Sequence, residues 1–460
     1  MQKNIVILGA GFGGVRCALD LAGKVPHDWK VILVDRNAYH LYYPRLYEEV
    51  IPHVSRNTYH VTRKCAVDVN EILKGTRVEF AQGEVQGIDC KTKTVVISTK
   101  RLDGARGEIS TARNTYGKEI SRLRPPASAR DDENFSLAYD YLVLAFGADA
   151  DYFGIPGLKE YACTLKSLED AEMIRERVGE FLRVHNPPRP PSTPRERETP
   201  FSIVIGGAGA TGVEVAAELA YLFRKIPQER WSITLVEALS HVLWMFPPAV
   251  GRYAHKRLEE LGVKLMLDTC IKEVLGGERG VEVVLAPRPL KPGEKESELA
   301  CDFLPEHEKR VAADILLWAG GVRANTLIAQ CGIPTDRKGR VEVDEHLVVK
   351  GMEGVFAIGD NAALTDPTSK QPVPAIAQAA LLEGKIAAEN IARAIRGQPL
   401  ALYPFPQFPA IVPLGRRDGV ALLGNRVLCG LPAWLLRQMA DGRYFASIVG
   451  WRKALKRCIL

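Results

Sequence analysis

The chain has 460 residues, of which 46% are hydrophobic and 25% are charged, a composition typical of globular proteins and sufficient for two or three domains. The formal net charge of +6 is small for this length and does not indicate binding to nucleic acid. We expect no secretory signal, because a predicted core strand already begins at residue 4, and no spanning helix, because the sequence has no apolar run of 18 residues. We expect no metal site, because the nine histidines and nine cysteines lack metal-site spacing.

A glycine-rich turn stands near the start of the chain. The apolar residues 4–8 predict a strand, residues 9–14 read GAGFGG, and residues 15–21 predict a helix. This order is typical of a dinucleotide fingerprint, in which glycines allow a tight turn, close approach to a pyrophosphate and close packing of helix on strand. The helix N-terminus offers N–H groups to the phosphates. The residues predicted to hold this first dinucleotide are Gly9, Gly11, Phe12, Gly13 and Gly14.

The following segments continue a parallel sheet. The apolar run 30–34 ends in Asp35, whose carboxylate can accept hydrogen bonds from a ribose diol. Short strands at 78–80 and 93–97 predict an antiparallel excursion, and the polar stretch 101–136 predicts a surface insertion. The run 139–148 predicts a buried parallel strand that ends in small residues, among them Ala145 and Gly147, where the backbone can pass close to a ligand.

A second fingerprint follows the proline-rich linker 187–200. Residues 201–205 predict a strand, residues 207–212 read GAGATG, and residues 213–222 predict a helix. Two complete fingerprints imply two dinucleotides in two Rossmann-type domains, and therefore an α/β fold. A further strand, 313–321, again ends in small residues after a polar loop at 286–310. The residues predicted at this second site are Gly207, Gly209, Thr211, Gly212 and Gly320.

Two acidic residues complete the pattern. The strand 232–236 ends in Glu237, whose carboxylate would repel a ribose 2′-phosphate, and no Arg or Lys follows it closely. This arrangement favours NADH over NADPH. Later in the chain, an apolar strand delivers Gly359 and Asp360, and Asp360 could either cap a helix or accept a hydrogen bond from a cofactor hydroxyl.

With these segments assembled, the chain resembles the two-dinucleotide flavoproteins of the pyridine nucleotide-disulfide oxidoreductase superfamily. Within that superfamily it is most similar to the type II NADH dehydrogenases, which are single-subunit NADH:quinone oxidoreductases. The resemblance covers nearly the whole chain outside the insertions. The segments that carry it are 9–14, 40–47, 145–147, 152–157, 165–171, 206–214, 318–322, 355–360 and 377–384.

The resemblance implies FAD on the first fingerprint and on Asp360, with NADH on the second. It implies that the NADH domain is inserted into the FAD domain, with boundaries at 1–158 and 324–395 for FAD, 159–323 for NADH, and 396–460 for a C-terminal region. The implied reaction is hydride transfer from NADH to FAD, followed by transfer of two electrons to a membrane quinone without proton pumping.

Two residues are implied in catalysis. Glu214 lies where the family has an acidic residue near the nicotinamide and flavin, although the helix dipole alone also favours a glutamate in the first turn. Gln378 matches the first glutamine of the family's quinone-site helix and is the candidate contact for a quinone carbonyl. The second glutamine of that helix is replaced here by Leu382, which leaves the type of quinone open.

Two other functions remain open. A sulfide:quinone oxidoreductase would need reactive cysteines beside the flavin, and Cys163 and Cys331 are the candidates, although burial as structural thiols explains them better. An NADH-sensing flavoprotein that acts through a partner would bind the same dinucleotides with little turnover.

The C-terminal residues 431–458 combine apolar helix faces with six basic residues and one acidic residue, and so carry 6 − 1 = +5. This pattern favours an amphipathic helix or helix pair that lies on an anionic lipid surface, with a break at Asp441 and Gly442. The expected location is the cytoplasmic face of a bacterial-type inner membrane, with peripheral attachment. Packing of this helix on the protein's own core or at a homodimer interface is the alternative.

Overall fold

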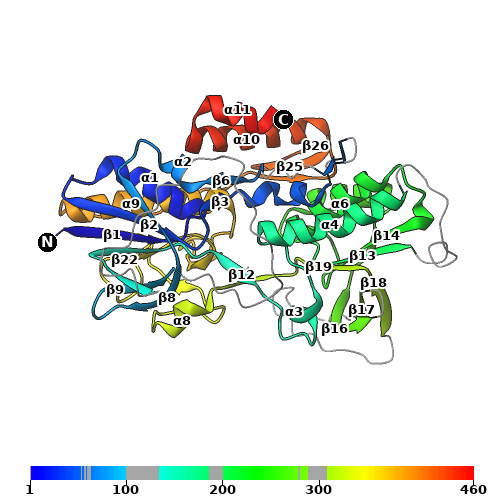
Figure 1. Ribbon diagram of the computed structural model, residues 1–460, viewed down its shortest axis with the longest axis horizontal. Coiled ribbons are helices and arrows are strands. Elements are labelled where there is room, and N and C mark those ends of the chain that lie inside the picture. Colours follow the sequence, from blue (N-terminus) through cyan, green and yellow to red (C-terminus); the bar gives the residue numbers. More distant parts are fainter. Residues whose placement is uncertain are drawn as a thin grey trace. The chain divides into compact units, whose positions relative to one another are not determined.

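The computed structural model describes residues 2–52, 54–55, 58–59, 64–99, 134–185, 200–277, 280–287 and 308–459. The chain forms two compact units (Figure 1). The first comprises Met1–Leu41, Ala66–Asp149 and Arg323–Pro406, and the second comprises Tyr42–Cys65, Ala150–Val322 and Gln407–Leu460. Each unit contains one of the two glycine fingerprints, and the chain passes between the units within β12 (Ala148–Ala150) and β20 (Val322–Ala324).

A parallel sheet forms the centre of the first unit. Its strand order is β22-β11-β1-β2-β7, with every neighbouring pair parallel. Helix α1 (Phe12–Lys24) lies against this sheet with α9 (Ala377–Ile395) beside it (Figure 1). A Cβ built on Gly384 would lie 2.3 Å from the Gly13 carbonyl oxygen, so glycine is required for this close helix packing. The strands are β1 (Lys3–Leu8), β2 (Trp29–Asp35), β7 (Val78–Gln82), β11 (Tyr141–Leu144) and β22 (Val355–Ala357).

A three-stranded antiparallel sheet completes the first unit. It consists of β8 (Glu84–Asp89), β9 (Thr94–Ser98) and β10 (Asn134–Ala138). The prediction that residues 78–80 belong to an antiparallel excursion is wrong, because β7 pairs in parallel with β2. The expected insertion at 101–136 lies outside the described residues up to 133, and its last three residues belong to β10 instead. The shorter elements are β3 (Tyr39–Leu41), β6 (Ala66–Asp68), α2 (Val69–Leu73), α8 (Thr326–Gln330), β21 (Val341–Glu342), η5 (Gly359–Asn361) and β23 (Ala362–Ala363).

The second unit has its own parallel sheet, in the order β15-β14-β13-β19. An antiparallel sheet of β16, β17 and β18 packs on it, and Val204 and Leu316 of the parallel sheet share a core with Ile271 and Val283 of the antiparallel sheet. The linker 187–199 and residues 288–307 of the expected polar loop lie outside the described residues, and the ends of that loop belong to β17 and β18. The elements are α3 (Leu158–Tyr161), α4 (Leu168–His185), β13 (Phe201–Gly206), α6 (Ala210–Phe223), η3 (Gln228–Arg230), β14 (Trp231–Val236), α7 (Pro248–Glu260), β15 (Lys264–Met266), β16 (Thr269–Gly277), β17 (Gly280–Pro287), β18 (Lys309–Ala313) and β19 (Ile315–Trp318).

The C-terminal helices belong to this second unit. Helix α10 runs without interruption from Leu431 to Val449 and ends at Gly450, whose φ of 81° stops it, before α11 (Trp451–Ile459). The predicted break at Asp441 and Gly442 is therefore wrong. Asp441 is 1% exposed, accepts a hydrogen bond of 2.6 Å from Tyr42 Oη and pairs at 3.0 Å with Arg437 one turn earlier. These contacts keep the helix continuous at Asp441. The remaining elements are η1 (Tyr43–Val50), β4 (Val54–Ser55), β5 (Thr58–Tyr59), β24 (Ala410–Pro413), β25 (Gly419–Leu423) and β26 (Arg426–Cys429).

The predicted α/β class with two parallel-sheet, Rossmann-type cores is confirmed. Among the described helices, none is both long and apolar enough to cross a membrane.

Candidate functional site

The first glycine loop joins β1 to α1 and passes very close to other backbone atoms of the first unit. Gly9 has a φ of +114°, and a Cβ built there would lie 2.2 Å from the Ala145 carbonyl oxygen. A Cβ on Gly14 would lie 1.8 Å from the carbonyl oxygen of Gly9. Both contacts are backbone to backbone and cannot yield, so these two positions require glycine.

The N-terminus of α1 has the features of an anion site. Its N-cap is Gly11, which makes no side-chain capping hydrogen bond. A Cβ built on Gly11 meets no other described atom within 4 Å. The start of a helix without a side-chain cap can bind an anion through its N–H groups, and the space beside Gly11 suits a pyrophosphate.

Asp35 at the end of β2 holds this loop in place. Its carboxylate oxygens accept hydrogen bonds of 2.7 Å from the backbone N–H of Ala10 and of Asn37. Burial raises the pKa of Asp35, and these N–H donors oppose that rise by stabilising the carboxylate. A carboxylate fixed in this way retains lone pairs for a ribose diol.

His40, the first residue of the segment 40–47, contacts the first glycine loop. It is fully buried, and its Nδ1 lies 2.8 Å from the carbonyl oxygen of Ala10, while its ring packs edge-on against Phe12 with ring centroids 5.1 Å apart. The contact with a carbonyl places the proton on Nδ1. Burial lowers the pKa of His40 to about 4, so the imidazole that contacts the first glycine loop is neutral at neutral pH.

The second glycine loop repeats the first in its local geometry. Gly207 has a φ of +99°, and its added Cβ would lie 2.5 Å from Gly320 Cα. A Cβ on Gly212 would lie 1.9 Å from the carbonyl oxygen of Gly207. The N-cap of α6 is Gly209, again without a side-chain capping hydrogen bond, and Thr211 is exposed in the first turn.

Glu237 takes the place of Asp35 in this second loop. It is 8% exposed, and its carboxylate accepts hydrogen bonds from the backbone N–H of Ala208 at 2.6 Å and of Leu239 at 3.1 Å. Burial raises the pKa of Glu237, whereas the N–H donors lower it. Each compact unit therefore contains the same arrangement of a glycine loop, the N-terminus of the following helix and a terminal acid, which we call a cradle. The first cradle consists of residues 9–14 with Asp35, and the second of residues 207–212 with Glu237.

The ends of β11 and β22 are joined through Asn361, a residue that sequence reasoning missed. Asn361 is fully buried, donates from Nδ2 to the Leu144 carbonyl at 3.1 Å, and accepts from the Gly147 N–H at 3.2 Å. Asp360, its neighbour, is half-buried inside η5 rather than at the N-cap, which is Ile358. The only signal in the sequence that could have identified Asn361 is its position directly after Asp360, a predicted site residue.

Helix α9 begins beside this turn. Gln378 is exposed in its first turn, Leu382 is half-buried, and Glu383 is 3% exposed. The Glu383 carboxylate accepts a hydrogen bond from the Gly359 N–H, so this unpredicted residue fixes the turn that carries Asp360. Burial, with a contribution from the negative charge of Asp360, raises the pKa of Glu383 to about 7.

Glu214 on α6 lies in a group of charged residues within the second unit. Burial raises its pKa to about 8, the positive charge of Arg437 opposes that rise, and the negative charges of Asp441 and Glu48 add to it. Arg437 and Asp441 come from α10 and Glu48 from η1, so three elements distant in sequence meet around one carboxyl. A carboxyl with such a pKa can hold or release a proton near neutral pH.

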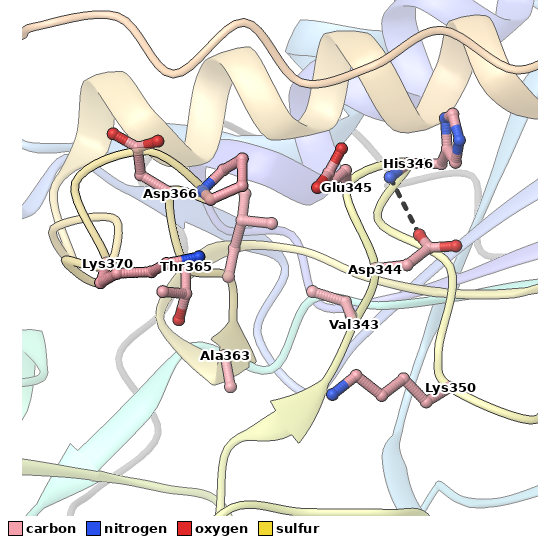
Figure 2. Close-up of a pocket in the computed structure, with 11 residues that line it drawn as sticks. Val343, Asp344, Glu345, His346, Lys350, Ala363, Thr365, Asp366 and Lys370 are labelled. Atoms are coloured by element: carbon pink, nitrogen blue, oxygen red, sulfur yellow. Dashed lines mark hydrogen bonds between the residues drawn. The ribbon is translucent and has the colours of Figure 1, made fainter.

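A surface hollow of about 560 Å³ opens elsewhere on the first unit (Figure 2). Asp344 in its wall accepts hydrogen bonds of 2.9 Å from the N–H groups of His346 and Val348, so its carboxylate stabilises a turn. None of the predicted site residues lines this hollow. Its lining residues are Val343, Asp344, Glu345, His346, Lys350, Ala363, Leu364, Thr365, Asp366, Pro367 and Lys370.

The two candidate cysteines lie in different units. Cys163 is 5% exposed, with its sulfur 4.0 Å from Met173 Sδ, and Cys331 Sγ accepts a hydrogen bond from the Ile88 N–H at 3.3 Å. Neither forms a disulfide with another described cysteine. Within the described ranges, no group of three or more His, Cys, Asp or Glu residues could hold a metal ion.

Comparison with known proteins gives concordant matches. A family model described as pyridine nucleotide-disulphide oxidoreductase matches residues 3–384. A relative from Staphylococcus haemolyticus (strain JCSC1435), named Type II NADH:quinone oxidoreductase, is 24% identical over 463 residues that cover 99% of this chain and 98% of the relative.

Two solved structures share the fold. NDH2 from Plasmodium falciparum in complex with NADH matches with a TM-score of 0.76 at 17% identity, over 100% of this chain and 98% of that one. The sulfide:quinone oxidoreductase from Aquifex aeolicus matches with a TM-score of 0.70 at 17% identity, over 97% of this chain and 91% of that one.

Proposed function

Because this chain belongs to the pyridine nucleotide-disulphide oxidoreductase family, we propose that it is an FAD-dependent NADH:quinone oxidoreductase of the type II class. The observation that carries the proposal is the pair of matching glycine cradles, one in each unit. The name of the full-length staphylococcal relative supports the choice of NADH and quinone as substrates. The enzyme does not pump protons in this proposal.

FAD occupies the first cradle. The N–H groups at the start of α1, behind Gly11, hold its pyrophosphate, Asp35 accepts from its ribose, and Asp360 accepts from a further hydroxyl. The fit rests on the uncapped helix N-terminus and on the open space beside Gly11. When bound, FAD supplies the redox chemistry, because it can accept two electrons as hydride from NADH and pass them on to a quinone.

NADH occupies the second cradle. The start of α6 behind Gly209 holds the pyrophosphate, and Glu237 faces the adenosine ribose. A 2′-phosphate placed beside the Glu237 carboxylate would meet like charge at short range, which costs on the order of 1–4 kcal/mol. The enzyme therefore prefers NADH to NADPH.

Two further residues act on the reacting groups. Glu214, whose pKa is raised to about 8, holds a proton close to neutral pH and can exchange it during the reaction. Gln378, exposed in the first turn of α9, donates from its amide to a quinone carbonyl. Leu382, one helical turn further on, gives the quinone an apolar contact where a second glutamine would have been polar.

The face of α10 and α11 that the second unit leaves uncovered attaches the enzyme to a membrane. Leu431, Leu435 and Met439 follow at four-residue spacing and are 50%, 48% and 62% exposed, and Trp451 and Leu455 on α11 are 67% and 54% exposed. The buried side of α10 carries its own apolar residues, among them Phe445 and Ile448, together with Arg437 and Asp441, so the exposed apolar side chains are not needed for packing on the core. The expected partner is an anionic lipid surface at the cytoplasmic face of a bacterial-type inner membrane.

Surface substitutions test membrane attachment more sharply than deletion of the tail, because Phe445 and Asp441 are buried and a deletion would open the core. Met439→Glu should release the protein from anionic liposomes in a co-sedimentation assay. Ala440→Glu is the matched control, since it adds the same charge at an exposed position on a different side of α10. Equal co-sedimentation of both variants and the wild type would refute attachment through this face.

Steady-state kinetics test the function as a whole. The purified protein should oxidise NADH at a rate that depends on the concentration of a ubiquinone or menaquinone analogue, and Gln378→Ala should slow flavin reoxidation without slowing flavin reduction. Turnover with sulfide in place of NADH would favour a sulfide:quinone oxidoreductase, the activity named for the Aquifex aeolicus structure. Rapid flavin reduction by NADH with slow reoxidation by every quinone would favour an NADH sensor.

A further inference from the structure

The turn that follows β14 presents two large apolar side chains beside the second cradle. Val242 and Leu243 are fully buried, whereas the next two residues, Trp244 and Met245, are 45% and 48% exposed. An exposed tryptophan next to an exposed methionine leaves apolar surface in water, and here that surface adjoins the second glycine loop.

The turn is held in position from two sides. The Leu243 N–H donates to the Ala208 carbonyl of the second glycine loop at 2.9 Å, and the Phe246 N–H closes the turn on the Leu243 carbonyl at 2.9 Å. Leu243 adopts a φ of +54°, a conformation that costs a leucine about 1 kcal/mol or more. On the other side, α7 approaches so closely that a Cβ on Gly251 would lie 2.7 Å from the Val242 carbonyl oxygen.

The same hydrogen bonds place the exposed pair relative to the dinucleotide. Ala208 donates its N–H to the Glu237 carboxylate and accepts from Leu243 with its carbonyl, so one residue ties the ribose-binding acid to the turn. Met245 Cε lies 3.6 Å from the Cβ position of Gly209, which is the N-cap of α6 and the expected pyrophosphate position. The turn thus borders the adenosine half of the cradle.

We propose that Trp244 is a specificity-determining residue of the NADH site, on whose indole face the adenine ring stacks, with Met245 covering the pyrophosphate side; this inference rests on the proposed assignment of NADH to the second cradle. A purine presents a π-face and little charge, so a rigid indole at the end of the ribose pocket is a suitable partner. Because the turn is already strained and fixed, little order has to be gained on binding.

Nicotinamide mononucleotide in its reduced form, NMNH, separates this role from a general structural one. NMNH carries the reacting nicotinamide but lacks adenosine, so it does not reach the indole. Trp244→Ala should raise the KM for NADH by roughly 5- to 150-fold, with a smaller change in kcat, while the KM for NMNH stays within about twofold of the wild type. ADP-ribose, as a competitive inhibitor, should weaken by the same factor as NADH.

Three variants make the test specific. Trp244→Phe keeps an aromatic face and should recover most of the affinity for NADH, whereas Trp244→Leu keeps apolar area without a π-face and should recover less. Leu402→Ala removes a 59% exposed side chain of the first unit and serves as the control for loss of exposed apolar surface. Flavin content and thermal unfolding confirm that each variant is folded.

The inference is overturned if Trp244→Ala has a wild-type KM for NADH, or if its KM rises equally for NADH and NMNH. Both results presuppose a wild type that oxidises NADH. A wild type that reduces its flavin with neither NADH nor NMNH would instead refute the proposed function, and the inference with it.

Discussion

Gly11→Ala and Gly209→Ala are the most informative substitutions, because they change the two cradles without disturbing the fold. Gly11 has a φ of −72° and Gly209 a φ of −69°, which alanine adopts freely. The added methyl at Gly11 meets no described atom within 4 Å, and that at Gly209 meets only Met245 Cε at 3.6 Å, an ordinary contact. Each methyl does enter the space beside an uncapped helix N-terminus, where a pyrophosphate has to approach.

The stability cost of these substitutions is small. Alanine is a poorer N-cap than glycine, which destabilises the fold by about 0.5–1 kcal/mol. Alanine also lowers the conformational entropy of the unfolded chain, which stabilises the fold by about 0.4–1 kcal/mol. The net change in the free energy of unfolding is therefore within about 1 kcal/mol, which shifts the Tm of the apoprotein by a few degrees at most. Any larger loss of function comes from the blocked cradle.

The two variants should fail in different steps. Gly11→Ala should purify as a folded but colourless protein with greatly reduced FAD content. Gly209→Ala should keep its FAD and its yellow colour but need at least tenfold more NADH to bleach it. Flavin absorbance, Tm and anaerobic NADH titration measure these outcomes. If Gly11→Ala kept full FAD content, or if Gly209→Ala bleached with wild-type NADH dependence, the assignment of that cradle would be refuted.

Three further predictions concern single groups in the cradles. Gly212→Ala should give insoluble or unfolded protein, because its Cβ would lie 1.9 Å from the Gly207 carbonyl oxygen; soluble expression at the wild-type level would contradict this contact. Glu237→Gln replaces one of the two accepting carboxylate oxygens by an NH2 group that faces a backbone N–H donor. We therefore expect about a tenfold higher KM for NADH and a smaller preference for NADH over NADPH. An unchanged ratio of the kcat/KM values for NADH and NADPH would count against the role of Glu237. The pKa of His40 is lower in the folded protein, so as the pH falls the unfolded chain binds a proton before the folded protein does. The free energy of unfolding should therefore fall between about pH 6.5 and about pH 4, by on the order of 3 kcal/mol. Urea unfolding of His40→Asn should show a flatter pH dependence over that window.

The parts of the fold that depend on local pattern could be predicted from the sequence. Strand, glycine loop, helix and terminal acid follow one another in both units because each step has a local signature. The strands predicted at 4–8 and 201–205 are each one residue longer in the structure, at 3–8 and 201–206. The terminal acids do more than the motif indicates. Asp35 and Glu237 also bind the N–H groups of their own glycine loops, a pairing visible only once strand and loop are adjacent.

Long-range contacts account for what the sequence did not predict. Residues 78–80 look like one arm of a hairpin, but Val78 pairs with Val31 in the parallel sheet. Asp441 and Gly442 read as a helix break, yet the ion pair with Arg437 and the hydrogen bond from Tyr42 keep the helix continuous. The pair with Arg437 has the i, i+4 spacing of an ion pair on a helix, but the hydrogen bond from Tyr42 cannot be assigned from spacing, since Tyr42 is 399 positions away.

Several support residues gave no sign in the sequence of the contact that they make. Glu383 follows the substituted position Leu382 and reads as an ordinary helix residue, but it is buried and binds the Gly359 N–H. His40 and Asn361 are equally silent in sequence, and each becomes meaningful only through the carbonyl that it contacts. Such residues fix the backbone of a site rather than touch its ligand, so their type is set by neighbours that the sequence alone does not place.

An anaerobic titration of the wild-type protein tests the central claim most directly. One equivalent of NADH per FAD should bleach the flavin, and one equivalent of a ubiquinone or menaquinone analogue should restore its absorbance. Protein without FAD even after reconstitution, or flavin that NADH leaves oxidised, would contradict the claim that the two cradles bind FAD and NADH in one reaction.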